Sequence, residues 1–180
     1  MQAQVEIRRA RPADAASIGA VHVAAWRSAY AGILPVAYLA RLSALRQAAG
    51  YDATIRGGAG VFVATAAGRV VGFATTGPAR TKLADGEVET IYVLDDHREQ
   101  GAGRHLLRAS AAWLAQQGCN SLFLWVLRDN PSRWFYERLG GRRTASGTVP
   151  VAGQSVPQDA YIWDPIERLL AEAPPALDPP

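Results

Sequence analysis

The chain has 180 residues, of which 49% are hydrophobic and 19% are charged, with both signs spread along the sequence. This composition excludes a disordered chain and is sufficient for one well-formed core. The net charge is +3, and Lys82 is the only lysine among 19 basic residues, so arginines carry the positive charge. Arginine favours planar contacts with phosphate and carboxylate groups. Because the arginines are scattered and form no stripe, we expect no nucleic-acid partner.

Cysteine content and apolar runs indicate the cellular location that we expect for the protein. Cys119 is the only cysteine, which excludes an internal disulfide and a cysteine-based zinc site and favours a reducing, cytoplasmic location. Residues 1–10 lack the apolar core of a signal peptide, and no stretch has the apolar length of a membrane span. We therefore expect no membrane partner. We also expect no metal, because no histidine pair has metal-ligand spacing with a carboxylate.

In chain order, the first half of the sequence predicts a strand, two helices, a loop and two further strands, at residues 5–10, 12–30, 36–45, 51–60, 61–65 and 70–76. Pro12 and Asp14 suit the first turn of the long helix. The second helix rests on apolar residues at helical spacing. The last two strands are β-rich runs joined across Ala67 and Gly68, which predicts a hairpin.

The second half predicts a strand, a helix, a strand, a helix and two strands, at residues 88–94, 101–117, 122–127, 131–139, 142–149 and 155–163. The continuous apolar run that begins at Leu122 is typical of a strand buried on both faces. Pro150 and Pro157 punctuate the last two strands and make them less distinct. This order of elements predicts an α/β (α+β) fold, with a mixed sheet and helices on its faces.

The segment from Tyr92 to Arg104 runs from a strand through a short loop into a helix. Helix N-termini offer free N–H groups and a positive dipole end, and glycine lets an anion approach closely. Gly101 and Gly103 stand at the start of this helix, which fits a pyrophosphate site. A dinucleotide fingerprint would need a third glycine at Leu106, and a Walker loop would need Gly-Lys-Ser/Thr. Both are absent, so we exclude these two classes.

Two motifs in order make the sequence resemble the Gcn5-related N-acetyltransferase (GNAT) superfamily. Arg98, Gly101 and Gly103 match its pattern of Arg or Gln, two residues, Gly, one residue, and Gly or Ala, directly after a hallmark strand at residues 91–93. Residues 130–140 are similar to its Asn followed by Phe-Tyr-Glu-Arg-Leu-Gly. The two motifs together, separated by a helix and a buried strand, are far more specific than either alone.

The resemblance implies a mixed, mostly antiparallel central sheet flanked by helices on both faces, with acetyl-CoA as cosubstrate. It implies one GNAT domain over residues 1–166, which leaves residues 167–180 as a helix end and a proline-rich tail that we expect to be disordered. The family often dimerises, which leaves a homodimer open. The implied cofactor contacts lie on the hallmark strand and in the two motifs: Ile91, Tyr92, Val93, Arg98, Glu99, Gln100, Gly101, Ala102, Gly103, Arg104 and Asn130.

Acetyl transfer from a thioester to an amine requires a base, because an alkylamine with a pKa of about 10 is mostly protonated at neutral pH. Glu87 and Glu89 are the candidates. They lie two residues apart on one strand, so simple alternation places both on one face together with Ile91 and Val93. In the resembled family an acid on this strand often acts through water. Proximity to the thioester favours Glu89 and the family pattern favours Glu87, so the choice stays open.

Tyr136 is the candidate acid. Its phenol, with a reference pKa of about 10, can return a proton to a thiolate whose conjugate acid has a pKa of about 8.5. Asn130 would hold the pantetheine amide or cap the following helix, and the two roles are compatible. Trp26 and Tyr30 are the candidate substrate-binding residues, since they resemble the Trp-Arg-x-x-Tyr pattern of one bacterial branch.

The predicted function is the direct transfer of the acetyl group of acetyl-CoA to the primary amine of a small molecule. A protein or peptide amine is the alternative acceptor. Trp125 stands where the ribosomal-protein branch of the family often carries a glutamate, which favours the small molecule. A noncatalytic acyl-CoA-binding module is an alternative from another class, and the candidate acid and bases, Tyr136, Glu87 and Glu89, count against it.

Overall fold

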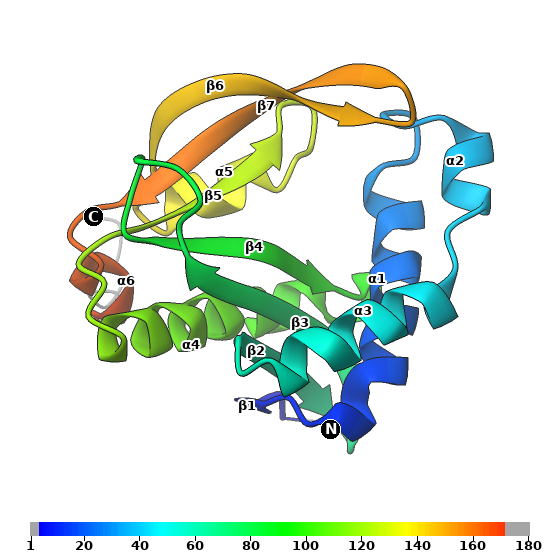
Figure 1. The fold of residues 1–180 in the computed structure, drawn as a ribbon, viewed down its shortest axis with the longest axis horizontal. Coiled ribbons are helices and arrows are strands. Elements are labelled where there is room, and N and C mark those ends of the chain that lie inside the picture. Colours follow the sequence, from blue (N-terminus) through cyan, green and yellow to red (C-terminus); the bar gives the residue numbers. More distant parts are fainter. Residues whose placement is uncertain (1–3, 172–180) are drawn as a thin grey trace, which may run out of the picture.

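The computed structural model describes residues 4–171 and arranges them around one seven-stranded sheet (Figure 1). The strand order is β1-β2-β3-β4-β5-β7-β6, and β4 with β5 is the single parallel pair within this sheet. The bounds of the strands are β1 (Glu6–Arg9), β2 (Gly60–Ala66), β3 (Arg69–Pro78), β4 (Gly86–Val93), β5 (Leu122–Leu127), β6 (Arg142–Val151) and β7 (Gln154–Trp163). The predicted mixed, mostly antiparallel sheet is confirmed.

Helices cover both faces of the sheet, as predicted. They are α1 (Ala15–Ala29), α2 (Val36–Ala40), α3 (Ala44–Arg56), α4 (Ala102–Gln116), α5 (Arg133–Arg138) and α6 (Glu167–Leu170). On one face, Ile18 of α1 and Tyr51 of α3 pack against Val63 of β2. On the other face, Leu106 of α4 packs against Phe62, the neighbour of Val63 in β2. No helix within residues 4–171 combines the length and apolar character needed to cross a membrane.

Two hairpins close with two-residue turns in which both residues have positive φ. Ala67 and Gly68 connect β2 to β3 with φ of 49° and 74°, and Ala152 and Gly153 connect β6 to β7 with φ of 52° and 77°. Turns of this handedness match the twist of the flanking strands. The first hairpin was predicted at these residues, and the second extends until it lies beside α2 (Figure 1).

The prediction of a loop over residues 51–60 was wrong, because α3 continues to Arg56. The predicted helix over residues 36–45 is in fact α2 and the first residues of α3. Ser43 separates the two helices, since its side chain accepts a hydrogen bond from the Arg46 N–H group at 3.3 Å and caps α3. Tyr51, whose ring lies edge-on to Phe73 at 5.0 Å between centroids, anchors the second half of α3 to the sheet. This tertiary contact has no local sequence signal.

The sheet opens between β4 and β5. Their parallel pairing joins Gly86 to Leu122 and Glu87 to Phe123. Beyond these pairs β4 continues to Val93 beside β3, and β5 continues beside β7. The two strands therefore spread apart in the middle of the sheet, as Figure 1 shows, and the edge of β4 that faces β5 is left without a strand partner.

Candidate active site

A pocket of about 400 Å³ lies where β4 and β5 separate. Residues 88–93 of β4 and 124–126 of β5 form its walls, α5 and the loop before it cover a third side, and the beginning of α4 lies at one end. Segments that are distant in the sequence thus meet around one cavity. The predicted site residues that line it are Tyr30, Glu89, Ile91, Tyr92, Val93, Arg98, Gly103, Asn130 and Tyr136.

The candidate phosphate site is built by the entry into α4. A 3-10 segment, Asp95–Gln100, leads to Gly101, whose φ of 79° is left-handed and costs glycine little strain. The first helical hydrogen bond runs from the His105 N–H group to the Gly101 carbonyl at 3.0 Å. The N–H groups of residues 102–104 precede that bond, so they are the donors that a helix N-terminus offers to an anion.

The phosphate motif has a packing role in the fold in addition to its predicted ligand-binding role. A Cβ atom on Gly103 would lie 3.2 Å from the ring of Phe135, so this glycine also lets α5 approach α4. Arg98 lines the pocket while its guanidinium lies 2.9 Å from the Asp95 carboxylate. Of the other predicted cofactor contacts, those outside the pocket lining are Gln100, Gly101, Ala102 and Arg104. The side chain of Glu99 lies outside the described part of the structure.

Glu89 forms a bulge in β4. On the neighbouring strand Thr76 pairs with Val88 and Thr75 pairs with Thr90, so Glu89 is the extra residue between two registered pairs. A bulge of one residue reverses the inward and outward alternation of every residue beyond it. The hydroxyls of Thr75 and Thr90 lie 2.7 Å apart, on the face that carries α1 and α3.

Glu87 and Glu89 share one face of β4, as predicted. The prediction that Ile91 and Val93 lie on that same face was wrong. Ile91 and Val93 pack into the apolar cluster under α4. Tyr92 packs on the opposite face, in the cluster under α1 and α3, and the two glutamates lie on that same face. The prediction from strict alternation failed because of the bulge at Glu89. That bulge is set by the register between β3 and β4, which cannot be read from the spacing of residues in β4 alone.

The two glutamates differ in burial and share one partner. Glu89 lines the pocket, whereas Glu87 is buried beside it and does not. Arg80, from the loop between β3 and β4, places Nη2 at 3.1 Å from Glu89 Oε1 and Nε at 3.5 Å from Glu87 Oε2. Sequence reasoning missed Arg80, because an arginine in a polar loop has no motif that marks it.

Tyr136 lies in α5 and is buried against Tyr161 and Trp163, each with its ring centroid 6.3 Å away. Burial raises the pKa of its phenol well above the ordinary value, so the hydroxyl keeps its proton at neutral pH. Asn130 is buried at the turn before α5, where its side-chain oxygen accepts a hydrogen bond from the Ser132 N–H group at 2.9 Å. It therefore stabilises the turn before α5, although the N-cap residue of this helix is Ser132 and not Asn130 as one of its two predicted roles required.

An aromatic face of α1 closes the far end of the pocket. Tyr30 lines the cavity, and its hydroxyl lies 3.3 Å from that of Tyr92. Burial raises the pKa of both phenols. Trp26 stacks on His22 at 5.0 Å and meets Tyr30 edge-on at 4.9 Å, but it does not line the pocket. Its position supports Tyr30 and Tyr92 from behind.

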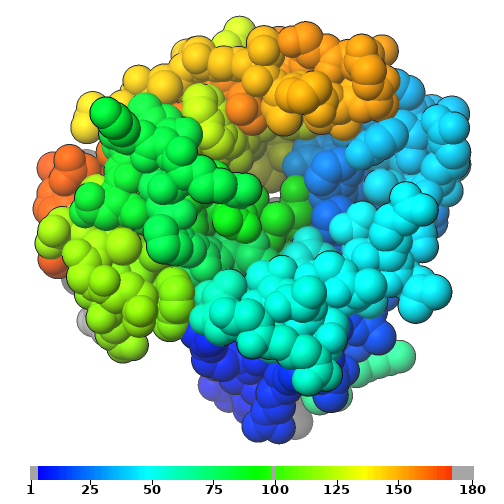
Figure 2. Space-filling model, in the orientation of Figure 1, coloured from blue at the N-terminus to red at the C-terminus, as the bar shows by residue number. Residues whose placement is uncertain are grey.

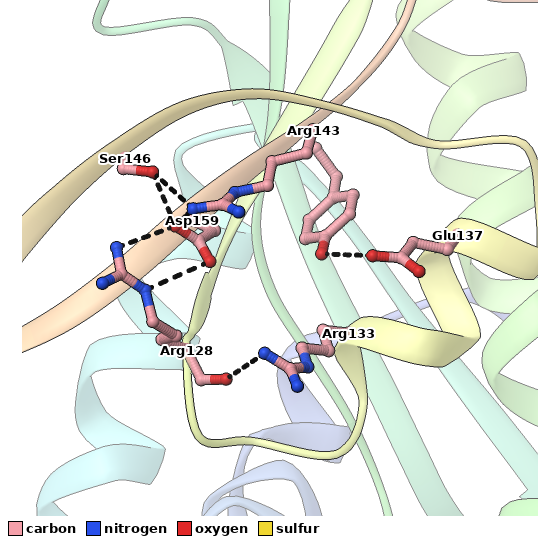
Figure 3. Close-up of polar contacts among 7 residues, drawn as sticks. Arg128, Arg133, Glu137, Arg143, Ser146 and Asp159 are labelled. Atoms are coloured by element: carbon pink, nitrogen blue, oxygen red, sulfur yellow. Dashed lines mark hydrogen bonds and ion pairs between the residues drawn. The ribbon is translucent and has the colours of Figure 1, made fainter.

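A buried carboxylate beside α5 ties the last strands together (Figure 3). Asp159 of β7 accepts hydrogen bonds from Arg128 at 3.1 Å, Arg143 at 2.9 Å and Ser146 at 2.8 Å. Burial acts to raise the pKa of Asp159, but these hydrogen bonds and the two positive charges hold it below its usual value. The Arg128 carbonyl in turn accepts a bond from Arg133 at 3.2 Å, which links this network to α5.

Known proteins resemble this chain in both sequence and fold. A family model described as the acetyltransferase (GNAT) family matches residues 23–141. The uncharacterized N-acetyltransferase YuaI of Bacillus subtilis is 37% identical over 168 residues, which cover 92% of this chain and 96% of that protein. A Gcn5-related N-acetyltransferase structure from Rhodopseudomonas palustris has a TM-score of 0.72 at 22% identity and covers 91% of this chain and 98% of its own.

A second structure, yncA of Salmonella typhimurium, is described with acetyl-CoA as its cofactor. It has a TM-score of 0.67 at 23% identity and covers 97% of this chain and 99% of its own. The family match extends over more than half of the sequence and contains both motifs of the pocket. This chain therefore belongs to the GNAT family and is an acetyltransferase.

Proposed function

We propose that this acetyltransferase moves the acetyl group of acetyl-CoA directly to the primary amine of a small molecule. One observation carries the proposal: a single pocket is lined by a carboxylate of β4, Glu89, and by a phenol of α5, Tyr136. The same pocket reaches the beginning of α4 at Arg98 and Gly103. A base, an acid and an anion site are thus arranged around one cavity.

The residues present fit acetyl-CoA on two counts. The first turn of α4 presents N–H groups and a positive dipole end, with Arg98 beside it, to a pyrophosphate. The edge of β4 that faces β5 has no strand partner beyond Glu87, so its peptide groups are available to an extended, amide-containing chain. The acetyl-CoA named with the Salmonella protein supports the same cosubstrate here.

The proposal assigns one proton transfer to Glu89 and another to Tyr136, because the two side chains differ in burial and in charge. Glu89, at the pocket and paired with a cation, is the carboxylate that takes the proton of the acceptor ammonium through water. The amine nitrogen then forms a bond to the acetyl carbon, the carbon–sulfur bond breaks, and Tyr136 gives its proton to the departing thiolate. The nitrogen, now part of the amide, releases its second proton, which returns through water to the Tyr136 oxygen. Glu87 is buried outside the pocket lining, which favours Glu89 of the two candidates.

Direct transfer is supported by the position of Cys119. This cysteine lies in the connection between α4 and β5, outside the pocket lining. Burial raises the pKa of its thiol, which lowers the fraction present as the nucleophilic thiolate. A cysteine in that state and place is not suited to carry the acetyl group.

The surroundings of the pocket favour a small acceptor. Figure 2 shows the molecule hollowed between the β6–β7 hairpin, the segment of α2 and α3, and the loop between β3 and β4. The hairpin and the α1–α2 region are joined through an apolar cluster that includes Leu39 and Val156. A hollow enclosed on several sides admits a compact amine more readily than an extended peptide.

The proposal is tested by thiol release from acetyl-CoA with polyamines, amino acids, aminoglycosides and peptides as acceptors. With the best acceptor, Glu89→Gln is expected to lower kcat/KM at neutral pH by a factor of about 10² to 10⁴, the usual range for a lost general base. The matched control, Glu87→Gln, makes the same chemical change two residues away and should lose far less. Preference for peptides over every small amine, or full activity of Glu89→Gln, would contradict the proposal.

A further inference from the structure

Arg80 joins the two glutamates of β4 into one charged group. Its Nη2 atom lies 3.1 Å from Glu89 Oε1, and its Nε atom lies 3.5 Å from Glu87 Oε2. Its backbone N–H group donates a further hydrogen bond to Glu87 Oε2 at 3.4 Å. The side chain and the main chain of one residue therefore both engage Glu87, while the outer end of the guanidinium reaches Glu89.

The exposed fraction of the three side chains increases from Glu87 through Glu89 to Arg80. The side chain of Glu87 is 10% exposed, that of Glu89 is 37% exposed and that of Arg80 is 69% exposed. The inner carboxylate is thus the fixed end of the group. Glu89 lines the pocket, so it is the member that can meet an acceptor.

The loop that carries Arg80 is fastened to the start of β5. The Ala79 N–H group donates to the Asp85 carbonyl at 2.9 Å, and the Asp85 N–H group donates to Ser121 Oγ at 3.1 Å. The Asp85 carboxylate accepts the Asn120 N–H group at 2.8 Å. These bonds hold both ends of the loop, so the position of Arg80 is defined by the fold.

Glu89 is faced by Arg80 from this loop, by Glu87 from its own strand and by the Tyr51 phenol from α3. Burial raises the pKa of Tyr51, so its phenol is neutral in the working pH range. The guanidinium contacts both carboxylates at once, with one nitrogen toward each glutamate. Without Arg80, Glu89 would lose the contact that holds its carboxylate in place at the pocket.

We propose that Arg80 is a positioning residue of this enzyme: anchored on Glu87, it holds the carboxylate of Glu89 at the pocket. The inference rests on the proposed function, in which Glu89 is the base. It also assigns different tasks to the two glutamates, with Glu87 as the anchor and Glu89 as the proton acceptor.

The test is Arg80→Gln, studied by two independent readouts. In the free protein, carbon NMR of the glutamate side chains should show the Glu89 carboxylate signal displaced from its wild-type position, because its guanidinium partner is gone. In kinetics with the best acceptor, kcat should fall by a factor of about 10 to 10² because the carboxylate is misplaced, while the KM for acetyl-CoA stays the same. Arg80→Lys, which restores the charge, should return both readouts most of the way.

Arg56→Gln is the matched control, because Arg56 is also an exposed arginine in an ion pair, with Asp52 at 2.8 Å on α3. It removes the same charge and should leave the Glu89 signal and kcat unchanged. An Arg80→Gln protein in which either the Glu89 signal or kcat matches wild type overturns the inference. The base assignment is judged separately by Glu89→Gln in the wild-type background, so either idea can fail while the other stands.

Discussion

Glu89 and Tyr136 line the same pocket, but they differ in burial and in the charge of their neighbours. Glu89 is partly exposed and paired with Arg80, whereas Tyr136 is buried among aromatic rings, which raises the pKa of its phenol and favours its neutral form. Such a difference in environment separates a proton acceptor from a proton donor at one pH. The same burial makes the Tyr136 phenol a weaker acid than free tyrosine, so we expect its contribution at the lower end of the range for general acids.

Tyr136→Phe removes one hydroxyl and keeps the ring that packs between Tyr161 and Trp163. We expect kcat to fall by about 10², with acetyl-CoA affinity altered much less. The measurement is turnover at a pH where chemistry limits the rate. The loss should shrink with an acyl donor whose thiol is more acidic, because that thiolate departs without help. Full turnover in Tyr136→Phe would leave solvent as the proton donor and Tyr136 as a packing residue.

At the scale of elements, the contact between α4 and α5 depends on a glycine. Gly103 begins α4 beside the pocket, and the ring of Phe135 in α5 lies where a Cβ atom would be crowded at 3.2 Å. The glycine at this position of the phosphate motif therefore also allows the close approach of the two helices. A change at Gly103 is expected to reach the cofactor site and Phe135 together.

Gly103→Ala should weaken acetyl-CoA binding, because the added methyl group displaces Phe135 and the wall of the pocket with it. Overpacking of this kind costs about 1–3 kcal/mol. Calorimetry of binding and denaturant unfolding measure the two effects, and adding Phe135→Leu should recover part of both. Gly50→Ala is the control, since a Cβ atom there meets nothing within 4 Å. Unchanged affinity and stability in Gly103→Ala would mean that the Phe135 ring moves aside without a cost in free energy.

The sequence predicted those elements whose pattern is local. The apolar run of β5 and the turn at Ala67 and Gly68 carry their own signals, and the phosphate motif places α4 to within a residue. The end of α3, the bulge at Glu89 and the reach of Arg80 depend on residues from other elements. Motifs therefore identified the residues of the candidate site, but only the register between strands showed which face each side chain takes.

At the scale of the whole molecule, a buried histidine couples stability to pH. His22 is packed among aromatic rings, with Nδ1 2.7 Å from the Tyr51 hydroxyl. Burial lowers the pKa of His22 from 6.5 to about 4. In the unfolded chain His22 therefore binds a proton near pH 6.5, whereas in the folded protein it binds one only near pH 4. The contribution of His22 to the free energy of unfolding is therefore full above pH 6.5 and is lost as the pH falls towards 4.

His22→Gln removes this titration and retains a side chain that can hydrogen-bond to Tyr51. We expect the variant to be less stable than wild type at pH 7. The gap in the free energy of unfolding should narrow by up to about 3 kcal/mol as the pH is lowered through the window between the two pKa values, at about 1.4 kcal/mol per pKa unit. Urea unfolding of both proteins at several pH values measures the gap. Parallel curves would show that His22 is protonated equally in both states.

The separation of β4 from β5 divides the sheet into a block of four strands, β1 to β4, and a block of three, β5 to β7. The direct main-chain connection between the blocks is confined to the short stretch at Gly86 and Glu87. Under the proposed function, acetyl-CoA in the pocket would touch both blocks, so its binding would stabilise the folded chain in proportion to the logarithm of its concentration. The cosubstrate would then help to hold the two blocks together, and the folded chain would be less stable whenever acetyl-CoA is scarce.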